Sequence, residues 1–367
     1  MPRTKPPFRA DMVGSLLRPA ALKEARAKYA SGLISHDALK AIEDSEIENI
    51  LKHQAEIGLQ SATDGEFRRS WWHFDFLANL EGCKLVHLDH GIQFHGVQTK
   101  AETVNVTGKV GFPQNHPMLA HFRYLKAHTS LVPKMTIPSP SVLHFRSGYN
   151  AIKAVYPDID QFFDDLGTAY QQAILAFYEA GCRYLQLDDT VWAYLCSADQ
   201  LAQARARGDD VDRLQERYAR TINKAVEVKP ADMTITMHVC RGNFRSTWIS
   251  EGGYEPVAET LLHGLNIDGY FLEYDTDRAG GFEPLRHLPK GNKMVVLGLI
   301  TSKSGALEKK DDVKRRIEEA TKYVALDQLC LSPQCGFAST EEGNILTEDD
   351  QWAKLALVVE TAREVWG

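Results

Sequence analysis

The chain has 367 residues, of which 44% are hydrophobic and 25% charged, a balance that excludes a disordered or fibrous protein. Its formal charge of −7 argues against a nucleic-acid partner, because phosphate binding needs a basic surface. No run approaches the roughly 20 apolar residues of a membrane span, and no secretory signal is visible. We therefore expect a cytoplasmic protein with no membrane contact, whose six cysteines form no disulfide framework.

Short aliphatic runs alternate with helical patterns along the chain, which is typical of βα units around a parallel sheet. The predicted strands are Arg9–Gly14, Leu59–Thr63, Val132–Pro138, Arg183–Leu187, Met233–His238, Gly269–Leu272, Lys293–Gly298 and Gln328–Leu331. Helical patterns cover 20–57 (two helices), 160–180, 210–228, 255–264, 311–324 and 349–365. At the start of the last helix, Thr347 and Asp350 are close to a capping-box pattern.

Eight strands that alternate with helices predict an α/β fold, a (β/α)8 TIM barrel. Residues at about 80–131 depart from this alternation: Lys84–Leu88, Ile92–His95 and Glu102–Lys109 alternate like hairpin strands, with a turn at 89–91. We predict a single catalytic barrel over residues 1–367, with a β-hairpin insertion at about 80–131 after the second strand. A doubly wound sheet is less favoured, because no G-x-G-x-x-G follows the first strand.

In a TIM barrel the chemistry lies at the carboxyl ends of the strands, and four metal-capable residues occur there. His238 and Cys240 end the fifth strand, two residues apart and therefore on one side of it. Glu273 ends the sixth strand, and Cys335 follows the eighth. One nitrogen, two sulfurs and one oxygen suit Zn2+ and disfavour magnesium or calcium. Among the other cysteines, Cys196 is the rival candidate because it lies in a loop after the fourth strand.

The residues at these strand ends resemble those of a known family, the cobalamin-independent methionine synthases. His238-Val239-Cys240, Glu273 and Cys335-Gly336 are similar to that family's zinc site, and Val13-Gly14-Ser15, Asp64-Gly65-Glu66 and Leu187-Asp188-Asp189 resemble its other motifs in the same order. The chain looks most like the short, single-barrel relatives of the catalytic C-terminal half. The same short branch also resembles epoxyalkane:coenzyme M transferase.

The resemblance implies a small-molecule thiol and a methyl donor as partners: homocysteine, and 5-methyltetrahydrofolate. Glu66 and Asp188 resemble the ligands of the homocysteine amino group, Ser15 resembles the ligand of its carboxylate, and Asp64 is a further substrate-binding candidate. Asp188 and His144 are the catalytic candidates. In the larger synthases a histidine that assists protonation stands where this chain has Thr301.

Several alternatives remain open from the residues alone. The zinc site fits alkyl transfer with another donor or thiol, and a structural zinc in a non-catalytic protein is a third interpretation. A decarboxylase of the uroporphyrinogen barrel type is a fourth, although it would not require this ligand set. The aromatic cluster of residues 71–74 is expected to pack against the barrel rim, with pterin stacking as the alternative. A homo-oligomer is possible.

Overall fold

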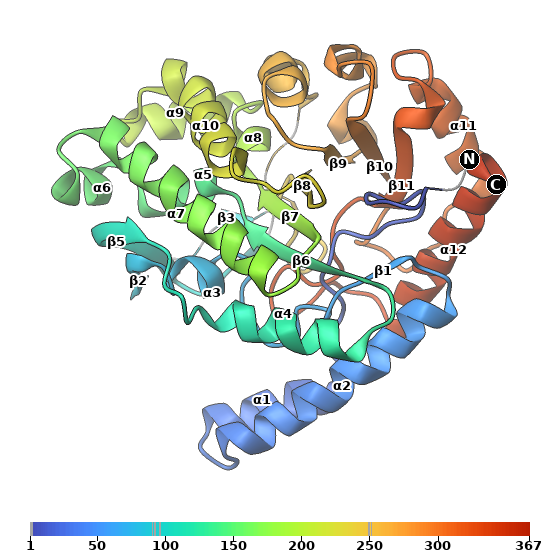
Figure 1. Cartoon of the computed structure of the whole chain (residues 1–367), viewed down its shortest axis with the longest axis horizontal. Coiled ribbons are helices and arrows are strands. Elements are labelled where there is room, and N and C mark those ends of the chain that lie inside the picture. Colours follow the sequence, from blue (N-terminus) through green and yellow to red (C-terminus); the bar gives the residue numbers. More distant parts are fainter. Residues whose placement is uncertain (1–2, 90, 92, 95–96, 249, 251) are drawn as a thin grey trace.

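Seven parallel strands form one curled sheet at the centre of the molecule. A computed structural model describes residues 3–89, 91, 93–94, 97–248, 250 and 252–367. The strands in spatial order are β1 (Ser61–Ala62), β6 (Val132–Pro138), β7 (Tyr184–Asp189), β8 (Thr234–Val239), β9 (Gly269–Glu273), β10 (Met294–Ile300) and β11 (Leu329–Pro333). Helices surround these strands (Figure 1). The predicted α/β fold of the TIM-barrel type is confirmed.

The segment from residue 9 to residue 16 lies between the two edges of this sheet. On one side Ala10 forms a parallel bridge with Leu331, and on the other the Leu16 N–H donates to the Gly65 carbonyl. The strand predicted over Arg9–Gly14 is therefore reduced to one bridge. Its carbonyl groups accept hydrogen bonds from side chains instead: Lys134 donates to Met12, Gln186 to Val13 and Thr63 to Gly14.

The α-helices of the described residues are, in chain order, α1 (Ala20–Ala30), α2 (His36–Glu56), α3 (Phe74–Leu77), α4 (Pro117–His128), α5 (Pro140–Ser147), α6 (Tyr149–Val155), α7 (Ile159–Glu179), α8 (Val191–Tyr194), α9 (Ala198–Ala206), α10 (Val211–Val226), α11 (Lys310–Ala320) and α12 (Glu348–Trp366). The helix predicted over 255–264 is a 3₁₀ turn, η1 (Glu255–Val257), followed by a π-helix, η2 (Glu259–His263). Further 3₁₀ turns are η3 (Asp277–Ala279), η4 (Glu283–His287) and η5 (Leu326–Gln328).

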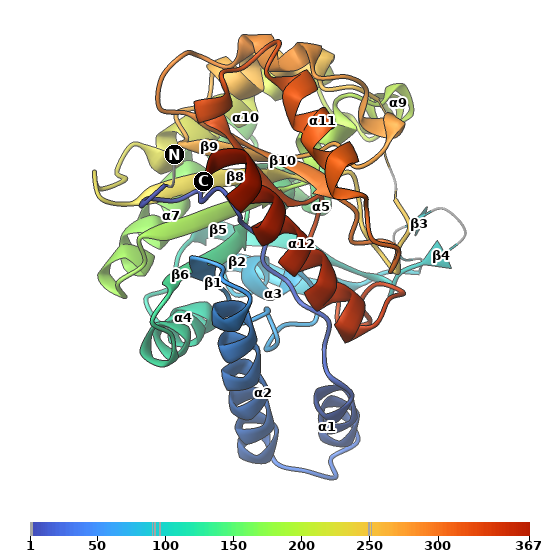
Figure 2. The same cartoon turned by 90° about the vertical axis from the view of Figure 1, so that its right-hand side faces the viewer.

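Both cartoon views show α1 and α2 extending from one side of the barrel (Figures 1 and 2). None of the helices in the described part of the chain has the length and hydropathy of a membrane span.

An antiparallel hairpin follows β1. Its strands β2 (Glu81–His87) and β5 (Glu102–Gly111) pair with each other, as the alternating pattern of the sequence predicts. A smaller pair, β3 (Gln93–Phe94) and β4 (Val97–Gln98), lies between them in the chain. The predicted turn at His90 and both ends of the predicted strand Ile92–His95 lie outside the described residues.

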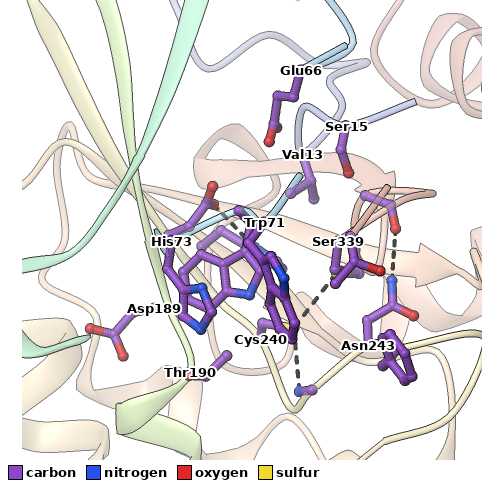
Figure 3. A pocket seen from close by; sticks show the side chains of 18 of the residues that line it. Val13, Ser15, Glu66, Trp71, His73, Asp189, Thr190, Cys240, Asn243 and Ser339 are labelled. Atoms are coloured by element: carbon purple, nitrogen blue, oxygen red, sulfur yellow. Dashed lines mark hydrogen bonds and ion pairs between the residues drawn. The ribbon is translucent and has the colours of Figure 1, made fainter. Parts of the chain in front are cut away.

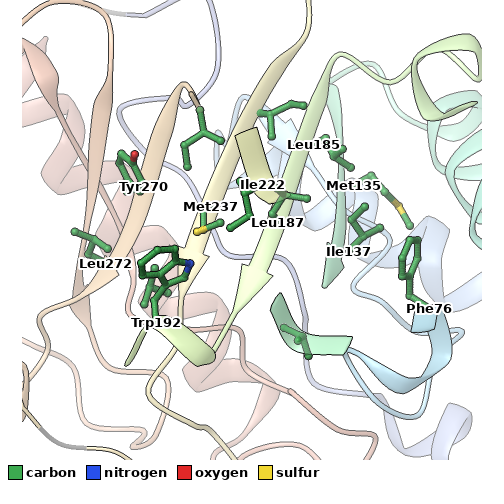
Figure 4. Packing of buried hydrophobic residues seen from close by; sticks show 14 of the residues in the cluster. Phe76, Met135, Ile137, Leu185, Leu187, Trp192, Ile222, Met237, Tyr270 and Leu272 are labelled. Carbon is green, nitrogen blue, oxygen red and sulfur yellow. The ribbon is translucent and has the colours of Figure 1, made fainter. Parts of the chain in front are cut away.

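The two faces of each barrel strand carry different side chains. Apolar residues such as Leu187, Met237 and Leu272 point outward and pack with helix residues such as Ile222 of α10 (Figure 4). Because side chains alternate along a strand, the residues between them face the barrel interior. This interior face carries Gln186 and Asp188 on β7, Thr236 and His238 on β8, and Phe271 and Glu273 on β9. The alternation therefore brings His238, Asp188 and Glu273 to the same mouth of the barrel.

The capping box at the start of α12 is present. The Thr347 hydroxyl accepts a hydrogen bond from the Asp350 N–H at 3.1 Å, and the Asp350 carboxylate accepts one from the Thr347 N–H at 2.9 Å. Thr347→Ala is expected to lower the free energy of unfolding by about 1 kcal/mol, because the first turn loses its cap. Urea denaturation measures this change. Thr347→Ser keeps the hydroxyl and should stay close to the wild type, so an equal loss in both variants would argue against the cap.

Candidate metal centre

Four buried side chains from three strand ends converge at the barrel mouth. His238 lies near the end of β8 and Cys240 directly after it, Glu273 ends β9, and Cys335 lies two residues beyond β11. One ligand atom from each residue can be chosen so that all four lie within 4.8 Å of one another. All six cysteines of the chain are free thiols, and Cys196 lies apart from this cluster, with its Sγ 3.4 Å from the Trp192 carbonyl oxygen.

The geometry of the cluster fits a tetrahedral zinc ion. The sulfurs of Cys240 and Cys335 are 3.6 Å apart, too far for a disulfide and close to the roughly 3.8 Å that two Zn–S bonds of about 2.3 Å span at a tetrahedral angle. His238 Nε2 is 3.9 Å from Glu273 Oε1. Glu273 is completely buried, yet neither carboxylate oxygen has a hydrogen-bond partner among the described residues. A buried, unpaired carboxylate is costly unless it binds a cation, and a metal ion would satisfy it.

Asp188 orients the imidazole of His238. The two residues are register partners on β7 and β8, and Asp188 Oδ1 lies 3.3 Å from His238 Nδ1. The same oxygen accepts a hydrogen bond of 2.7 Å from Gln186. With Nδ1 engaged by the carboxylate, Nε2 of His238 is the nitrogen that faces the cluster. Carboxylates that hold the second nitrogen of a metal-binding histidine are common in zinc proteins.

Removing the charge of Asp188 should weaken metal binding. We expect Asp188→Asn to lower zinc affinity about tenfold, at the lower end of the range for such partners, because the amide oxygen can still accept from Nδ1. Competition with a chromogenic chelator measures the affinity. Gln186→Leu, which removes the other bond to this oxygen, should have a smaller effect. Unchanged zinc affinity in Asp188→Asn would contradict the orienting role.

The cluster opens into a pocket lined by charged, polar and aromatic side chains, a composition that provides polar groups to orient a small-molecule ligand. His238, Cys240 and Cys335 line it together with Ser15, Glu66 and Asp188. Figure 3 shows Ser15 and Glu66 on one side of this pocket and His73, Asp189 and Thr190 on another. The structure therefore brings three of the predicted substrate-binding residues, Ser15, Glu66 and Asp188, to the same cavity as the predicted metal ligands.

Two glycines allow the close contacts around Ser15 and Glu66. A Cβ atom on Gly14 would lie 2.6 Å from Glu66 Oε1, and a Cβ on Gly336 would collide with the Ser15 hydroxyl. Glu66 itself has a φ of 59°, a left-handed conformation that non-glycine residues rarely adopt and that often occurs at functional sites. Arg69 Nε donates to Glu66 Oε2 at 2.5 Å.

Asp64 and His144 are not among the residues that line the pocket next to the candidate metal ligands, which we call the metal pocket. Asp64 lines a neighbouring cavity of about 380 Å³, and its Oδ1 accepts a hydrogen bond of 2.8 Å from the Glu66 N–H, so it shapes the turn that presents Glu66. His144, predicted as a catalytic residue, points into an aromatic cluster, where its Nδ1 lies 2.8 Å from the Tyr218 hydroxyl. Burial, with the charges of two nearby arginines, lowers the pKa of His144 to about 3. Its ring is neutral at pH 7, and the structure does not bring it to the reacting groups.

Most arginines near the pocket are already engaged. Arg69 pairs with Glu66, and Arg68 pairs with Glu43 and Asp44 on α2. Arg18 donates to four carbonyl groups, and burial, with the charge of Arg69, lowers its pKa to about 9. Arg241 lies over the Tyr254 ring at 4.3 Å and donates to the Gly252 carbonyl.

Arg146 differs from these arginines. It lines the pocket and makes no ion pair with the carboxylates of the described residues. Arg146 was not predicted as a site residue, and no helix was predicted over 140–147. The signal was Ser139-Pro140, since a proline at the first helical position after a serine is a common helix start.

The rings of Trp72, His73 and Phe74 stack on one another. The His73 ring centroid is 4.4 Å from that of Trp72 and 3.9 Å from that of Phe74, with interplanar angles below 20°. Both faces of His73 are therefore covered by protein. Trp71, Trp72 and His73 also line the pocket, so the cluster forms a packed wall of the pocket at the barrel rim.

The chain matches one protein family over nearly its whole length. The family model of the cobalamin-independent synthase catalytic domain matches residues 8–364. The chain is 56% identical over 366 residues to the uncharacterised protein YxjG of Bacillus subtilis (strain 168), covering 99% of this chain and 96% of that protein.

Solved structures of similar fold have related descriptions. The crystal structure of a putative vitamin-B12-independent methionine synthase from Listeria monocytogenes has a TM-score of 0.80, 46% identity and full coverage of both chains. A B12-independent methionine synthase from Shewanella sp. W3-18-1, solved with selenomethionine, has a TM-score of 0.72 at 18% identity and covers 97% of each chain. At that identity the second match supports the fold alone.

Proposed function

Since the chain belongs to the catalytic-domain family of the cobalamin-independent synthases, we propose that it methylates the sulfur of homocysteine to give methionine. We propose that His238, Cys240, Glu273 and Cys335 bind zinc and that 5-methyltetrahydrofolate is the methyl donor. The observation that carries this proposal is the ligand cluster of two thiols, an imidazole and an unpaired carboxylate at the mouth of the barrel. The cluster opens into a pocket that is also lined by Glu66 and Asp188.

Zinc bound there would supply a Lewis acid at which an incoming thiol, otherwise mostly protonated at pH 7, becomes a thiolate. The protein side chains position the rest of the acceptor. Oε2 of Glu66 is held by Arg69, which leaves Oε1 for the homocysteine ammonium group, with Asp188 as a second negative charge nearby. The Ser15 hydroxyl accepts from the Ala338 N–H, so its proton is available for the homocysteine carboxylate. Such positioning contributes to rate by fixing the sulfur relative to the methyl group.

Two alternatives fit the described residues less well. A purely structural zinc site is normally closed by four protein ligands on short loops, whereas three of these ligands line an open pocket. Coenzyme M carries a sulfonate, which Glu66 and Asp188 would repel. Arg69 is already paired with Glu66, so it does not offset this repulsion beside Glu66, which supports an amino-acid thiol on that side of the pocket.

Metal analysis and a donor panel test the proposal. Purified protein is expected to hold about one zinc per chain and to form methionine from homocysteine and 5-methyltetrahydrofolate. Methionine is measured by mass spectrometry with isotope-labelled homocysteine, and S-methylmethionine serves as an alternative donor. Turnover with S-methylmethionine alone would refute folate as the donor. Zinc-loaded protein that forms no methionine with either donor would refute the methyltransferase proposal.

A further inference from the structure

Three side chains on one wall of the pocket each have a buried polar atom without a hydrogen-bond partner among the described residues. His73 Nε2, Arg146 Nε and Thr190 Oγ1 are each buried, and none has a partner within the described ranges. All three residues line the pocket. Buried polar groups in native proteins are nearly always paired, and an unpaired one calls for an explanation. Three such groups in one cavity indicate that a ligand completes their hydrogen bonds.

His73 presents a fixed hydrogen-bond donor. Its Nδ1 accepts from the Phe74 N–H at 3.0 Å, so the ring proton of the neutral form lies on Nε2. Burial, with the charges of Arg146 and Arg69, lowers the pKa of His73 well below its usual value, and the ring stays neutral. Stacking between Trp72 and Phe74 fixes the ring plane. The Nε2–H can therefore only donate, and its partner must be an acceptor.

Arg146 adds a positive charge to the same wall. It has no carboxylate partner among the described residues, and its charge acts directly on His73. An arginine presents a fork of N–H donors that matches a carboxylate. Thr190 adds a hydroxyl from the loop after β7. A wall with this composition favours a negatively charged acceptor over a cation or an apolar group.

This wall is separate from the proposed amino-acid subsite. In Figure 3 His73 and Thr190 lie on a different side of the pocket from Ser15 and Glu66. An acceptor thiol whose amino and carboxylate groups are bound at Glu66 and Ser15 uses only one of these two sides. The second side is therefore available to the second substrate.

We propose that His73, Arg146 and Thr190 recognise a carboxylate of the methyl donor. This inference rests on the proposed methyl transfer and names a chemical requirement that the donor must meet. The carboxylate has two possible sources: the glutamate tail of a folate, or the carboxylate of a smaller donor such as S-methylmethionine.

The test compares variants that remove one donor group at a time. His73→Phe keeps a ring that can stack but removes the N–H, and Arg146→Gln removes the charge. Each is expected to raise the KM for the methyl donor about tenfold, with unchanged zinc content and unchanged KM for homocysteine. Arg146→Lys keeps the charge and should recover part of the loss. An unchanged donor KM in both variants, or an equal rise in both KM values, would overturn the proposal.

Two donors distinguish the sources of the carboxylate. If the glutamate tail is bound, Arg146→Gln raises the KM for 5-methyltetrahydrofolate. It does not change the KM for 5-methyltetrahydropterin, which lacks the whole p-aminobenzoylglutamate group and carries no carboxylate. If the carboxylate of a smaller donor is bound, Arg146→Gln raises the KM for S-methylmethionine instead. Both results support the proposal and identify the source.

Direct binding separates this inference from the proposed function. Trp71 and Trp72 line the pocket, so quenching of their fluorescence reports binding of 5-methyltetrahydrofolate and of S-methylmethionine without turnover. If no methyl transfer occurs but one of these compounds binds, and binds about tenfold more weakly to Arg146→Gln, the recognition site stands without the reaction. The recognition site is refuted if neither compound binds to the wild type. It is also refuted if no compound binds more weakly to both His73→Phe and Arg146→Gln than to the wild type.

Discussion

Replacing Cys335 by alanine is expected to remove zinc from the purified protein and to abolish methyl transfer to homocysteine. The Cys335 sulfur lies 3.6 Å from that of Cys240, and alanine leaves three protein ligands, which come from the ends of the neighbouring strands β8 and β9. Loss of a thiolate ligand weakens a zinc site strongly, because each thiolate contributes both a bond and a negative charge. Zinc content by inductively coupled plasma mass spectrometry and methionine formation by mass spectrometry measure the two effects.

Cys330 provides a matched control on β11, the strand that Cys335 follows. It lies within β11, is completely buried, and packs in a separate cluster with Val13, Phe271, Met294 and Val296. Burial raises the pKa of its thiol to about 12, so it remains a protonated packing residue. Cys330→Ala should lower stability by leaving a small cavity but keep about one zinc per chain. A Cys335→Ala protein that retains zinc and activity would refute the ligand assignment.

Most of the barrel strands were predictable because they share one sequence pattern. Parallel strands buried on both faces need continuous apolar runs, and six of the eight predicted runs coincide with β6 to β11 within a few residues. The run at 9–14 was wrong in extent, because side chains of Thr63, Lys134 and Gln186 take the carbonyl bonds that a strand would use. No local pattern reveals such partners, which lie about 50 to 170 residues away in the chain.

The candidate site was predictable in its residue types but not in its contacts. His238, Cys240, Glu273 and Cys335 are unusual at strand ends, so their residue types and positions together singled them out. The role of Asp188 depends on the register between β7 and β8, which one sequence does not specify. The orientation of His144 is also a tertiary property, since a helix places it toward Tyr218 rather than toward the pocket. Arg146 was not predicted as a site residue, and the helix that carries it was not predicted either.

Glu66→Gln is expected to raise the KM for homocysteine about 10- to 100-fold with little change in kcat. Glu66 lies at the pocket with its side chain 12% exposed, and Arg69 holds one carboxylate oxygen in place. The amide keeps the shape of the side chain but loses the charge that pairs with the ammonium group. Hydrogen bonds to charged groups contribute about 1.5–3 kcal/mol, which corresponds to this range of KM. A change in KM alone identifies an interaction made equally in the bound substrate and the transition state.

Glu43→Gln is the matched control for this prediction. Glu43 is also a buried glutamate paired with an arginine, since its Oε2 lies 3.1 Å from Arg68 Nη1, but it lies on α2 outside the metal pocket. Any general effect of breaking a buried Glu–Arg pair should therefore occur in both variants as a loss of stability. Only Glu66→Gln should change the KM for homocysteine, and the KM for the methyl donor should stay the same. Equal KM values for homocysteine in the two variants would mean that Glu66 does not bind its amino group, and the acceptor subsite would have to be sought elsewhere in the pocket.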